Sequence, residues 1–235
     1  NWRTRIIFMR RGKLIAIEGT DGSGKQTQSE RLLNKLQSKG YSTEVLSFPR
    51  YDTLTGKVVG ELCLGKNLGL GVGSLFDNFA EADAKFASSF YGLDRLAAKP
   101  DIERLLNEND YLILDRYVES NMGHQCGKLE DPQERAGLRD WINKVEYEDN
   151  KLPKPDAVIF LYMPLKISKK LKAGMNELLD AHEADENHLK NAEAAYLELA
   201  EHFDWIRVNC SDDGENPRAM TDIHQEVYKN ISKLD

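Results

Sequence analysis

The fold of this chain is decided by the stretch KLIAIEGTDGSGKQT, residues 13–27. Its first seven residues form a short apolar run that ends at Gly19, which is typical of a parallel strand buried on both faces. After the glycine-rich loop the pattern becomes helical, with Leu32 and Leu36 on one stripe and Gly40 as the expected stop. The sequence therefore predicts a strand, a glycine loop and a helix in immediate succession.

The loop between this strand and this helix has the spacing of a phosphate-binding loop, or P-loop. Glycines allow successive backbone N–H groups to converge on phosphate oxygens, and the helix N-terminus adds positive potential. Lys25 supplies a mobile charge for the β- and γ-phosphates. A tight turn without a ligand is the alternative, but the flanking strand and helix favour a nucleotide site. We expect the following residues to bind ATP: Gly19, Thr20, Asp21, Gly22, Ser23, Gly24, Lys25, Gln26 and Thr27.

The residue after Lys25 departs from the usual motif. Gln26 stands where a hydroxyl that binds Mg²⁺ is normally found, and Thr27 follows one position later. Because Mg²⁺ keeps several waters in such sites, we expect the carboxylates of Asp115 and Asp21 to hold it through water or phosphate.

Four more strand patterns alternate with helical patterns along the chain, at residues 42–48, 111–114, 157–162 and 205–209. Five strands interleaved with helices predict an α/β fold of the P-loop NTPase type, with a five-stranded parallel sheet between helical layers. Ligands of such sheets bind at the carboxyl ends of the strands. We also expect one long helix from about residue 74 to residue 98. Its apolar stripe, interpreted as core, contains Phe76, Phe79, Ala82, Phe86, Phe90, Leu93 and Ala97.

Composition limits the remaining possibilities. With 32 Lys and Arg against 39 Asp and Glu, the net charge of −7 argues against partners such as nucleic acid or an anionic membrane. The longest apolar run, residues 157–165, is too short for a membrane helix, and three widely spaced cysteines predict no disulfide framework. We therefore expect a cytoplasmic protein with one P-loop domain at 13–235, a disordered lead-in at 1–12 and a lid at about 172–187.

Several motifs occur in the order that is found in one enzyme family. The loop EGTDGSGKQTQ, residues 18–28, resembles the P-loop of thymidylate kinases, and the resemblance covers roughly residues 13–210. The other motifs are FPRY at 48–51, Tyr91 four residues before Arg95, DRY at 115–117, and Asp180 three residues before Glu183. The resemblance implies a nucleoside monophosphate kinase that uses ATP and Mg²⁺ to phosphorylate dTMP. It also implies a homodimer, formed through the apolar face of the long helix.

The same resemblance assigns roles to individual side chains. Tyr91 would stack on the thymine ring and Arg95 would hydrogen-bond a base oxygen, whereas helical spacing alone leaves core packing and a solvated charge open. Arg50 would grip the 5′-phosphate of the acceptor, Asp21 would meet the sugar 3′-hydroxyl, and Arg116 would contact the phosphates being joined. The other residues implied for the acceptor site are Phe48, Pro49, Tyr51, Ser120, Asn121, His124 and Glu183. Asn121 is the candidate base contact, and His124 stands where many relatives carry an aromatic side chain that crowds the 2′ position.

One feature of the resemblance is missing. Thymidylate kinases bring an extra cation to the transferring phosphoryl group from an arginine in the P-loop or in the lid. Here Gly22 occupies the P-loop position, and no arginine lies between Arg139 and Arg207. Lys169 and Lys172, three residues apart, are therefore the candidate catalytic lysines. The run of Lys166, Lys169, Lys170 and Lys172 is equally consistent with a solvated helix face.

Two other functions remain as alternatives. A kinase of another nucleoside monophosphate would share the same P-loop and the same catalysis by positioning and charge neutralisation. A nucleotide-gated binding module would hydrolyse ATP slowly and respond little to dTMP.

Overall fold

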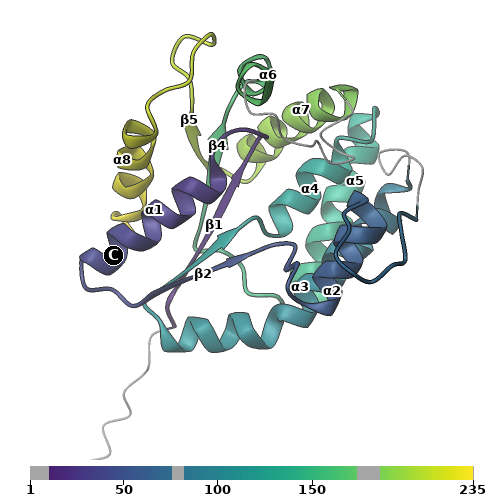
Figure 1. The fold of residues 1–235 in the computed structure, drawn as a ribbon, viewed down its shortest axis with the longest axis horizontal. Helices are drawn as coiled ribbons and strands as arrows, with labels where there is room; N and C mark the ends of the chain where they lie inside the picture. Colours follow the sequence, from purple (N-terminus) through teal and green to yellow (C-terminus); the bar gives the residue numbers. More distant parts are fainter. Residues whose placement is uncertain (1–10, 76–81, 174–185, 235) are drawn as a thin grey trace, which may run out of the picture.

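A five-stranded sheet forms the centre of the computed structural model, which describes residues 11–75, 82–173 and 186–234 (Figure 1). The strands lie in the order β2-β3-β1-β4-β5, and all four pairings are parallel. The α/β prediction is therefore confirmed. The strands are β1 (Lys13–Gly19), β2 (Thr43–Ser47), β3 (Tyr111–Asp115), β4 (Ala157–Tyr162) and β5 (Ile206–Asn209).

Helices cover both faces of the sheet (Figure 1). Helices α1 (Lys25–Ser38) and α8 (Met220–Ile231) pack on one face. The opposite layer holds α3 (Ala84–Glu108), α4 (Val118–Cys126), α5 (Pro132–Asn143) and α7 (Glu186–His202). The shorter helical elements are α2 (Leu54–Val58), the π-helical segments η1 (Val59–Cys63) and η3 (Lys144–Asp149), and α6 (Leu165–Ala173).

Alternation along the central strand divides the core between the two layers. Leu14 and Ala16 of β1 belong to the cluster that contains α3 and α4 residues, whereas Ile15 and Ile17 belong to the cluster that contains α1 and α8 residues. Successive side chains of a strand point to opposite faces, so a strand that is apolar at every position must be covered twice. This is why the unbroken apolar run predicted a buried parallel strand correctly.

The first helix ends as its sequence indicates. Helix α1 stops at Ser38, and Gly40 has φ +91°, a left-handed conformation that favours glycine. The N–H of Gly40 donates to the carbonyl oxygen of Gln37 at 2.9 Å, which closes the helix end.

The long helix differs from the prediction in its bounds and in its buried face. It begins at Ala84, capped by the carboxylate of Asp83, and continues through Pro100 to Glu108. Residues 74 and 75 are not helical, and Phe76 and Phe79 lie outside the described residues. Phe86, Leu93 and Ala97 are exposed, so the expected core stripe was wrong at these positions, whereas Ala82 is buried and Phe90 packs against a core cluster. The buried face carries small and polar side chains in its first half and large apolar ones in its second half: Ala84, Ala87, Ser88, Asp94, Arg95, Ala98, Ile102 and Leu106.

Two predicted segments lie mostly outside the described residues. Of the lead-in at 1–12, only Arg11 and Gly12 are described, and the N–H of Gly12 donates to the carbonyl oxygen of Leu106 at 2.8 Å. The predicted lid at 172–187 includes residues 174–185, which are not described. Among the described helices, none combines the length and the apolar content that a membrane span requires.

Candidate active site

The P-loop connects β1 to α1 at the carboxyl edge of the sheet. Gly22 and Gly24 have φ values of +72° and +80°, which favour glycine at both positions. A Cβ atom on Gly19 would lie 2.5 Å from the carbonyl oxygen of Leu161, so a side chain would not fit there. The ammonium of Lys25 donates to the carbonyl oxygens of Gly19 and Thr20 at 3.0 and 3.1 Å. The loop therefore has the backbone geometry of a phosphate-binding site, and its lysine side chain contacts the loop backbone.

Burial perturbs the charged groups around this loop. Desolvation lowers the pKa of Lys25 to about 8, the Arg116 charge acts in the same direction, and the nearby carboxylates of Asp21 and Asp115 oppose the shift. Desolvation also raises the pKa of Asp115. An anionic ligand in this position would favour the charged form of Lys25.

A cleft of about 380 Å³ opens beside the P-loop and joins several predicted site residues. Arg116 lines the cleft, has φ +67°, and donates to the carboxylate of Asp21 at 3.3 Å. Its other nitrogen lies 3.4 Å from Nε2 of His124, whose ring is stacked on that of His188 with a centroid distance of 5.6 Å. Other predicted residues that line the cleft are Gln26, Phe48, Pro49, Tyr51, Tyr91 and Asp115.

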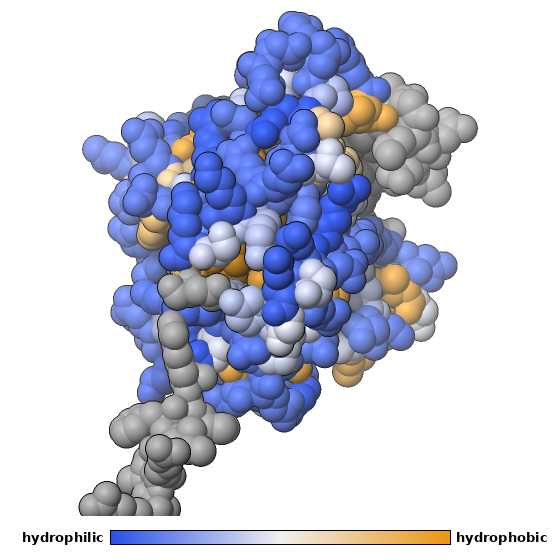
Figure 2. All heavy atoms as spheres, turned by 90° about the vertical axis from the view of Figure 1, so that its left-hand side faces the viewer, coloured by the Kyte–Doolittle hydropathy of each residue, from blue (hydrophilic) through white to orange (hydrophobic). Residues whose placement is uncertain are grey.

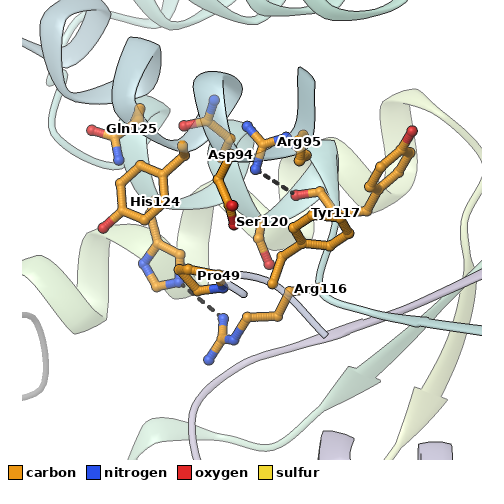
Figure 3. Close-up of a pocket in the computed structure, with 11 residues that line it drawn as sticks. Pro49, Asp94, Arg95, Arg116, Tyr117, Ser120, His124 and Gln125 are labelled. Atoms are coloured by element: carbon orange, nitrogen blue, oxygen red, sulfur yellow. Dashed lines mark hydrogen bonds between the residues drawn. The ribbon is translucent and has the colours of Figure 1, made fainter. Parts of the chain in front are cut away.

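A smaller recess of about 40 Å³ shares Phe48, Pro49, Tyr91, Arg116 and His124 with this cleft (Figure 3). Its wall adds Arg95, Ser120, Asn121 and Gln125. Within the described part of the chain, Oδ1 of Asn121 and both amide atoms of Gln125 are buried without a hydrogen-bond partner. Because an unpaired buried polar atom costs about 1–3 kcal/mol, these atoms mark a place where a polar ligand would be stabilised.

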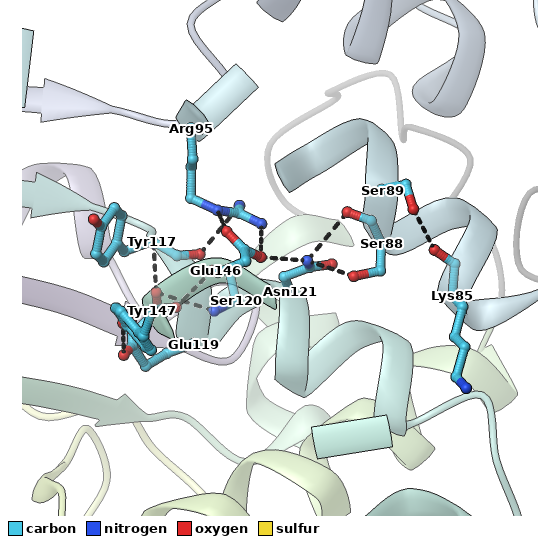
Figure 4. Close-up of polar contacts among 11 residues, drawn as sticks. Lys85, Ser88, Ser89, Arg95, Tyr117, Glu119, Ser120, Asn121, Glu146 and Tyr147 are labelled. Atoms are coloured by element: carbon cyan, nitrogen blue, oxygen red, sulfur yellow. Dashed lines mark hydrogen bonds and ion pairs between the residues drawn. The ribbon is translucent and has the colours of Figure 1, made fainter. Parts of the chain in front are cut away.

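Arg95 and Asn121 are held by a carboxylate that the motifs did not indicate (Figure 4). Glu146 of η3 accepts two hydrogen bonds from the Arg95 guanidinium, both at 2.5 Å, and both side chains are nearly fully buried. Nδ2 of Asn121 also donates to Glu146 at 2.9 Å and to the Ser88 hydroxyl at 2.8 Å. Arg95 is therefore not a solvated surface charge. The bidentate ion pair fixes the orientation of Arg95 beside the recess.

Glu18, the last residue before Gly19, ties the sheet to the helices around the site. Its carboxylate accepts from the backbone N–H groups of Tyr117 and Ser120 at 2.7 and 3.2 Å and from the Ser120 hydroxyl at 2.5 Å. The hydroxyl of Tyr196 on α7 lies 3.4 Å away. Burial raises the pKa of Glu18, while these donors stabilise its charged form. Ser120 was expected to bind the acceptor, but its hydroxyl donates a hydrogen bond to Glu18.

Arg50 does not reach the cleft in this structure. Its guanidinium pairs with Asp101 at 3.1 Å and with Asp94 at 3.6 Å. Asp94 also accepts from the Arg50 backbone N–H at 2.8 Å and from the Thr55 hydroxyl at 2.7 Å. Two acidic side chains of α3 therefore hold this arginine, and the acceptor phosphate that the resemblance assigns to it would have to compete with them.

Helix α6, which carries the lysine run, packs directly on the P-loop. A Cβ atom on Gly22 would lie 2.8 Å from the hydroxyl oxygen of Ser168. Helix α6 therefore occupies the space beside Gly22, the position at which the resemblance would place an arginine. Lys169 follows Ser168 and is half-buried. Lys166 and Lys170 both pair with Glu215, the latter at 3.5 Å. The side chain of Lys172 and the whole of Glu183 lie outside the described residues.

Comparison with known proteins agrees with this geometry. The sequence model of a family described as thymidylate kinase matches residues 17–220. Thymidylate kinase of Mycobacterium tuberculosis H37Rv is 32% identical over 196 residues, which cover 80% of this chain and 85% of the relative. The human thymidylate kinase is 31% identical over 156 residues, 66% of this chain and 63% of the relative.

Solved structures share the fold. Thymidylate kinase from Candida albicans superposes with a TM-score of 0.70 at 22% identity and covers 95% of this chain and 92% of its own. The enzyme from Ehrlichia chaffeensis gives a TM-score of 0.63 at 20% identity, covering 94% and 100%. With a family match over residues 17–220 and a glycine loop of the required geometry, the chain belongs to the thymidylate kinase family.

Proposed function

We propose that this chain transfers the γ-phosphate of ATP to the 5′-phosphate of dTMP and releases dTDP and ADP. One observation carries the proposal: the cleft beside the P-loop shares a wall with a recess that contains unpaired polar atoms, and Arg116 lines both. An acceptor whose base occupies the recess would extend its phosphate toward the donor phosphates. The family match over residues 17–220 favours dTMP over other acceptors.

Catalysis would consist of positioning and charge neutralisation, because phosphoryl transfer asks little covalent chemistry of the protein. The ammonium of Lys25 would move from the carbonyl oxygens of Gly19 and Thr20 to the phosphates. Arg116 would leave its ion pair with Asp21 and bind the phosphates that are being joined. The carboxylate of Asp21 would then be available to accept a hydrogen bond from the sugar 3′-hydroxyl. The same fixed charges would stabilise the negative charge that develops during transfer.

Mg²⁺ fits the acidic groups of the cleft. Asp21 and Asp115 both line it, and carboxylate oxygens are the ligands that Mg²⁺ prefers. Burial raises the pKa of Asp115, the charges of Arg116 and Lys25 oppose this shift, and a bound cation would favour the carboxylate further. Mg²⁺ would neutralise phosphate charge, while Lys25 and Arg116 supply the remaining positive charges.

Base recognition would use the groups that lack partners in the recess. Gln125 can donate and accept hydrogen bonds through its two buried amide atoms, and Asn121 can accept through Oδ1. Tyr91 lines the same recess and offers a ring on which a pyrimidine can stack. Gln125 is therefore added to the acceptor site that the motifs indicated.

We further propose a cytoplasmic homodimer that buries the exposed apolar side of α3. Phe86, Leu93 and Leu96 are 47%, 49% and 40% exposed, and they lie on one side of this helix. The side of the molecule formed by α1 and α8 is largely hydrophilic, which does not favour it as the interface (Figure 2). Sedimentation at several concentrations would test the dimer.

Acceptor dependence separates a kinase from a nucleotide-gated module. With ATP and Mg²⁺ alone, ADP release is expected to be slow, and adding dTMP should accelerate it many-fold with equimolar dTDP as product. A nucleotide-gated module would instead hydrolyse ATP at a rate that dTMP leaves unchanged.

Arg95→Ala is expected to weaken dTMP binding by about 1–3 kcal/mol, or roughly 5- to 150-fold, with a much smaller effect on ATP. The loss follows from removing a buried donor beside the base. Calorimetric titration of each nucleotide measures the two affinities.

The same substitution leaves Glu146 buried without its partner, which lowers stability. The double variant Arg95→Met with Glu146→Leu removes both charges and serves as the folding control. The double variant should show the same loss of dTMP affinity as Arg95→Ala. Equal losses of dTMP and ATP affinity in both variants would place Arg95 outside the base site.

The activity should fall at alkaline pH because of Lys25. Its pKa of about 8 in the ligand-free protein means that the ammonium is present below pH 8 and is lost as the pH rises through this value. We expect kcat/KM for ATP to decline above about pH 8. The decline in kcat should occur at a higher pH, because bound phosphates favour the charged lysine. A profile of kcat/KM that stays flat to pH 9.5 would contradict this assignment.

A further inference from the structure

A second cavity, of about 320 Å³, lies at the opposite edge of the sheet from the cleft. Its wall includes Ala157 and Ile206, the first residues of β4 and β5, whereas the active-site cleft lies at the carboxyl ends of the strands. The volume falls in the range of small-molecule sites, about 300–1,000 Å³. A nucleotide in the active site would not occupy this cavity.

The cavity contains a buried carboxyl group with an unused oxygen. Glu119 of α4 is 5% exposed, and its Oε1 accepts a hydrogen bond from the Tyr147 hydroxyl at 2.5 Å (Figure 4). Within the described residues its Oε2 is buried and has no hydrogen-bond partner. Leaving a buried polar atom unpaired is costly, so a donor placed beside Oε2 would be stabilised.

Aromatic rings form much of the remaining wall. The rings of Phe203 and Trp205 are stacked with a centroid distance of 6.1 Å, and Tyr147 adds a third ring. The ammonium of Lys154 already lies 5.4 Å from the centroid of the Tyr147 ring. Aromatic faces attract cations, so this wall suits a flat or apolar molecule that carries positive charge.

Charged groups of both signs surround the cavity. The carboxyl groups of Glu119, Asp156 and Asp204 line it together with the ammonium of Lys154. Asp156 is paired with Arg11 at 3.3 Å and with Lys13 at 3.9 Å, which neutralises its charge. Glu119 is the lining carboxyl group that has a buried oxygen without a hydrogen-bond partner among the described residues, so selection for a cation rests on this group.

We propose that this cavity is a second ligand site, which binds an organic monocation with an aromatic or apolar body through Oε2 of Glu119 and the rings of Tyr147 and Trp205. The site is independent of the proposed phosphoryl transfer, because none of these three side chains lines the cleft or the recess.

Binding of such a cation should release a proton. Burial raises the pKa of Glu119 to about 8, the charge of Glu18 adds to this shift, and Arg95 and the Tyr147 hydroxyl oppose it. At pH 7 the carboxyl is therefore mostly protonated, and a bound cation requires the carboxylate. Affinity for the cation is expected to rise between pH 6 and pH 8.

Three ligands of one shape test the proposal, namely benzamidine, benzamide and benzoate, with charges of +1, 0 and −1. Calorimetric titration into the full chain with saturating dTMP, in buffers of different ionisation enthalpy, measures affinity and proton release together. Benzamidine is expected to bind at least about tenfold more tightly than benzamide, with benzoate weakest.

Glu119→Gln should reduce benzamidine affinity to the level of benzamide and abolish proton release, whereas Glu134→Gln, an exposed residue on α5, should change neither. If Glu119→Gln does not fold, Tyr147→Phe provides a second variant, expected to alter proton release while the aromatic wall remains. Equal binding of the three ligands, unchanged binding to Glu119→Gln, or competition between benzamidine and dTMP would overturn the proposal.

Discussion

Lys25→Ala is expected to reduce dTDP formation by about 10³-fold or more, with the fold intact. The ammonium of Lys25 lies in the loop, where it donates to two P-loop carbonyl oxygens. Its removal leaves the developing charge on the phosphoryl group with fewer partners. Stopped-time assays of dTDP at saturating ATP and dTMP measure the loss.

Lys39, at the other end of α1, provides a matched control. Lys39 follows α1, is exposed, and contacts no part of the cleft, so Lys39→Ala should retain full activity. Circular dichroism and thermal unfolding check that both variants fold. Near-normal turnover by a folded Lys25→Ala variant would remove the P-loop from the mechanism.

The lysines of α6 are expected to replace the arginine that relatives use. Lys169→Ala, Lys172→Ala and the double variant should be compared, and kcat should fall about 10²-fold or more in at least one of them, with little change in KM for dTMP. The contact of Ser168 with Gly22 places α6 against the P-loop, which brings this run close to the phosphates. A lysine offers a point charge without the bidentate fork of arginine.

Lys166 and Lys170 provide the control for this series, because both pair with Glu215. Alanine at these positions should leave kcat nearly unchanged. If Lys169→Ala, Lys172→Ala and the double variant all keep the wild-type kcat, then Lys25, Arg116 and Mg²⁺ neutralise the phosphates without help from α6.

The fold was largely predictable because its main signals are local. The apolar run of β1, the glycine loop and the stop at Gly40 each depend on a few neighbouring residues, and all three occur as expected. Strand bounds differ from the predicted ones by only one or two residues. Interleaved strand and helix patterns then leave a parallel sheet as the natural arrangement.

The long helix shows where periodicity misleads. A stripe of Phe86, Leu93 and Ala97 has the spacing of a buried face, yet it is exposed, and the adjacent face with Asp94 and Arg95 is buried. Periodicity shows that one side of a helix is apolar but does not say whether the same chain covers it. Ion pairing makes burial of the polar face possible, and the partners lie far away in sequence.

The site was predictable only as far as the motifs reach. Motif order brought Asp21, Tyr91 and Arg116 to one cleft, but it gave no sign of Glu146, which is 51 residues from Arg95. Gln125 was accessible to sequence reasoning, since it directly follows His124, which the resemblance assigns to the acceptor site. The pairing of Arg50 with two acids of α3 could not be inferred, because no local pattern encodes it.

The acceptor specificity of the wild-type protein tests the central claim most directly. ADP release and product identity would be measured with ATP and Mg²⁺ across dTMP, dUMP, dGMP and AMP at equal concentrations. The proposed function predicts the highest kcat/KM for dTMP, with dTDP as product, and lower values for the purine nucleotides because the recess is small. A higher kcat/KM for dGMP or AMP, or ADP release at the same rate with and without dTMP, would contradict it.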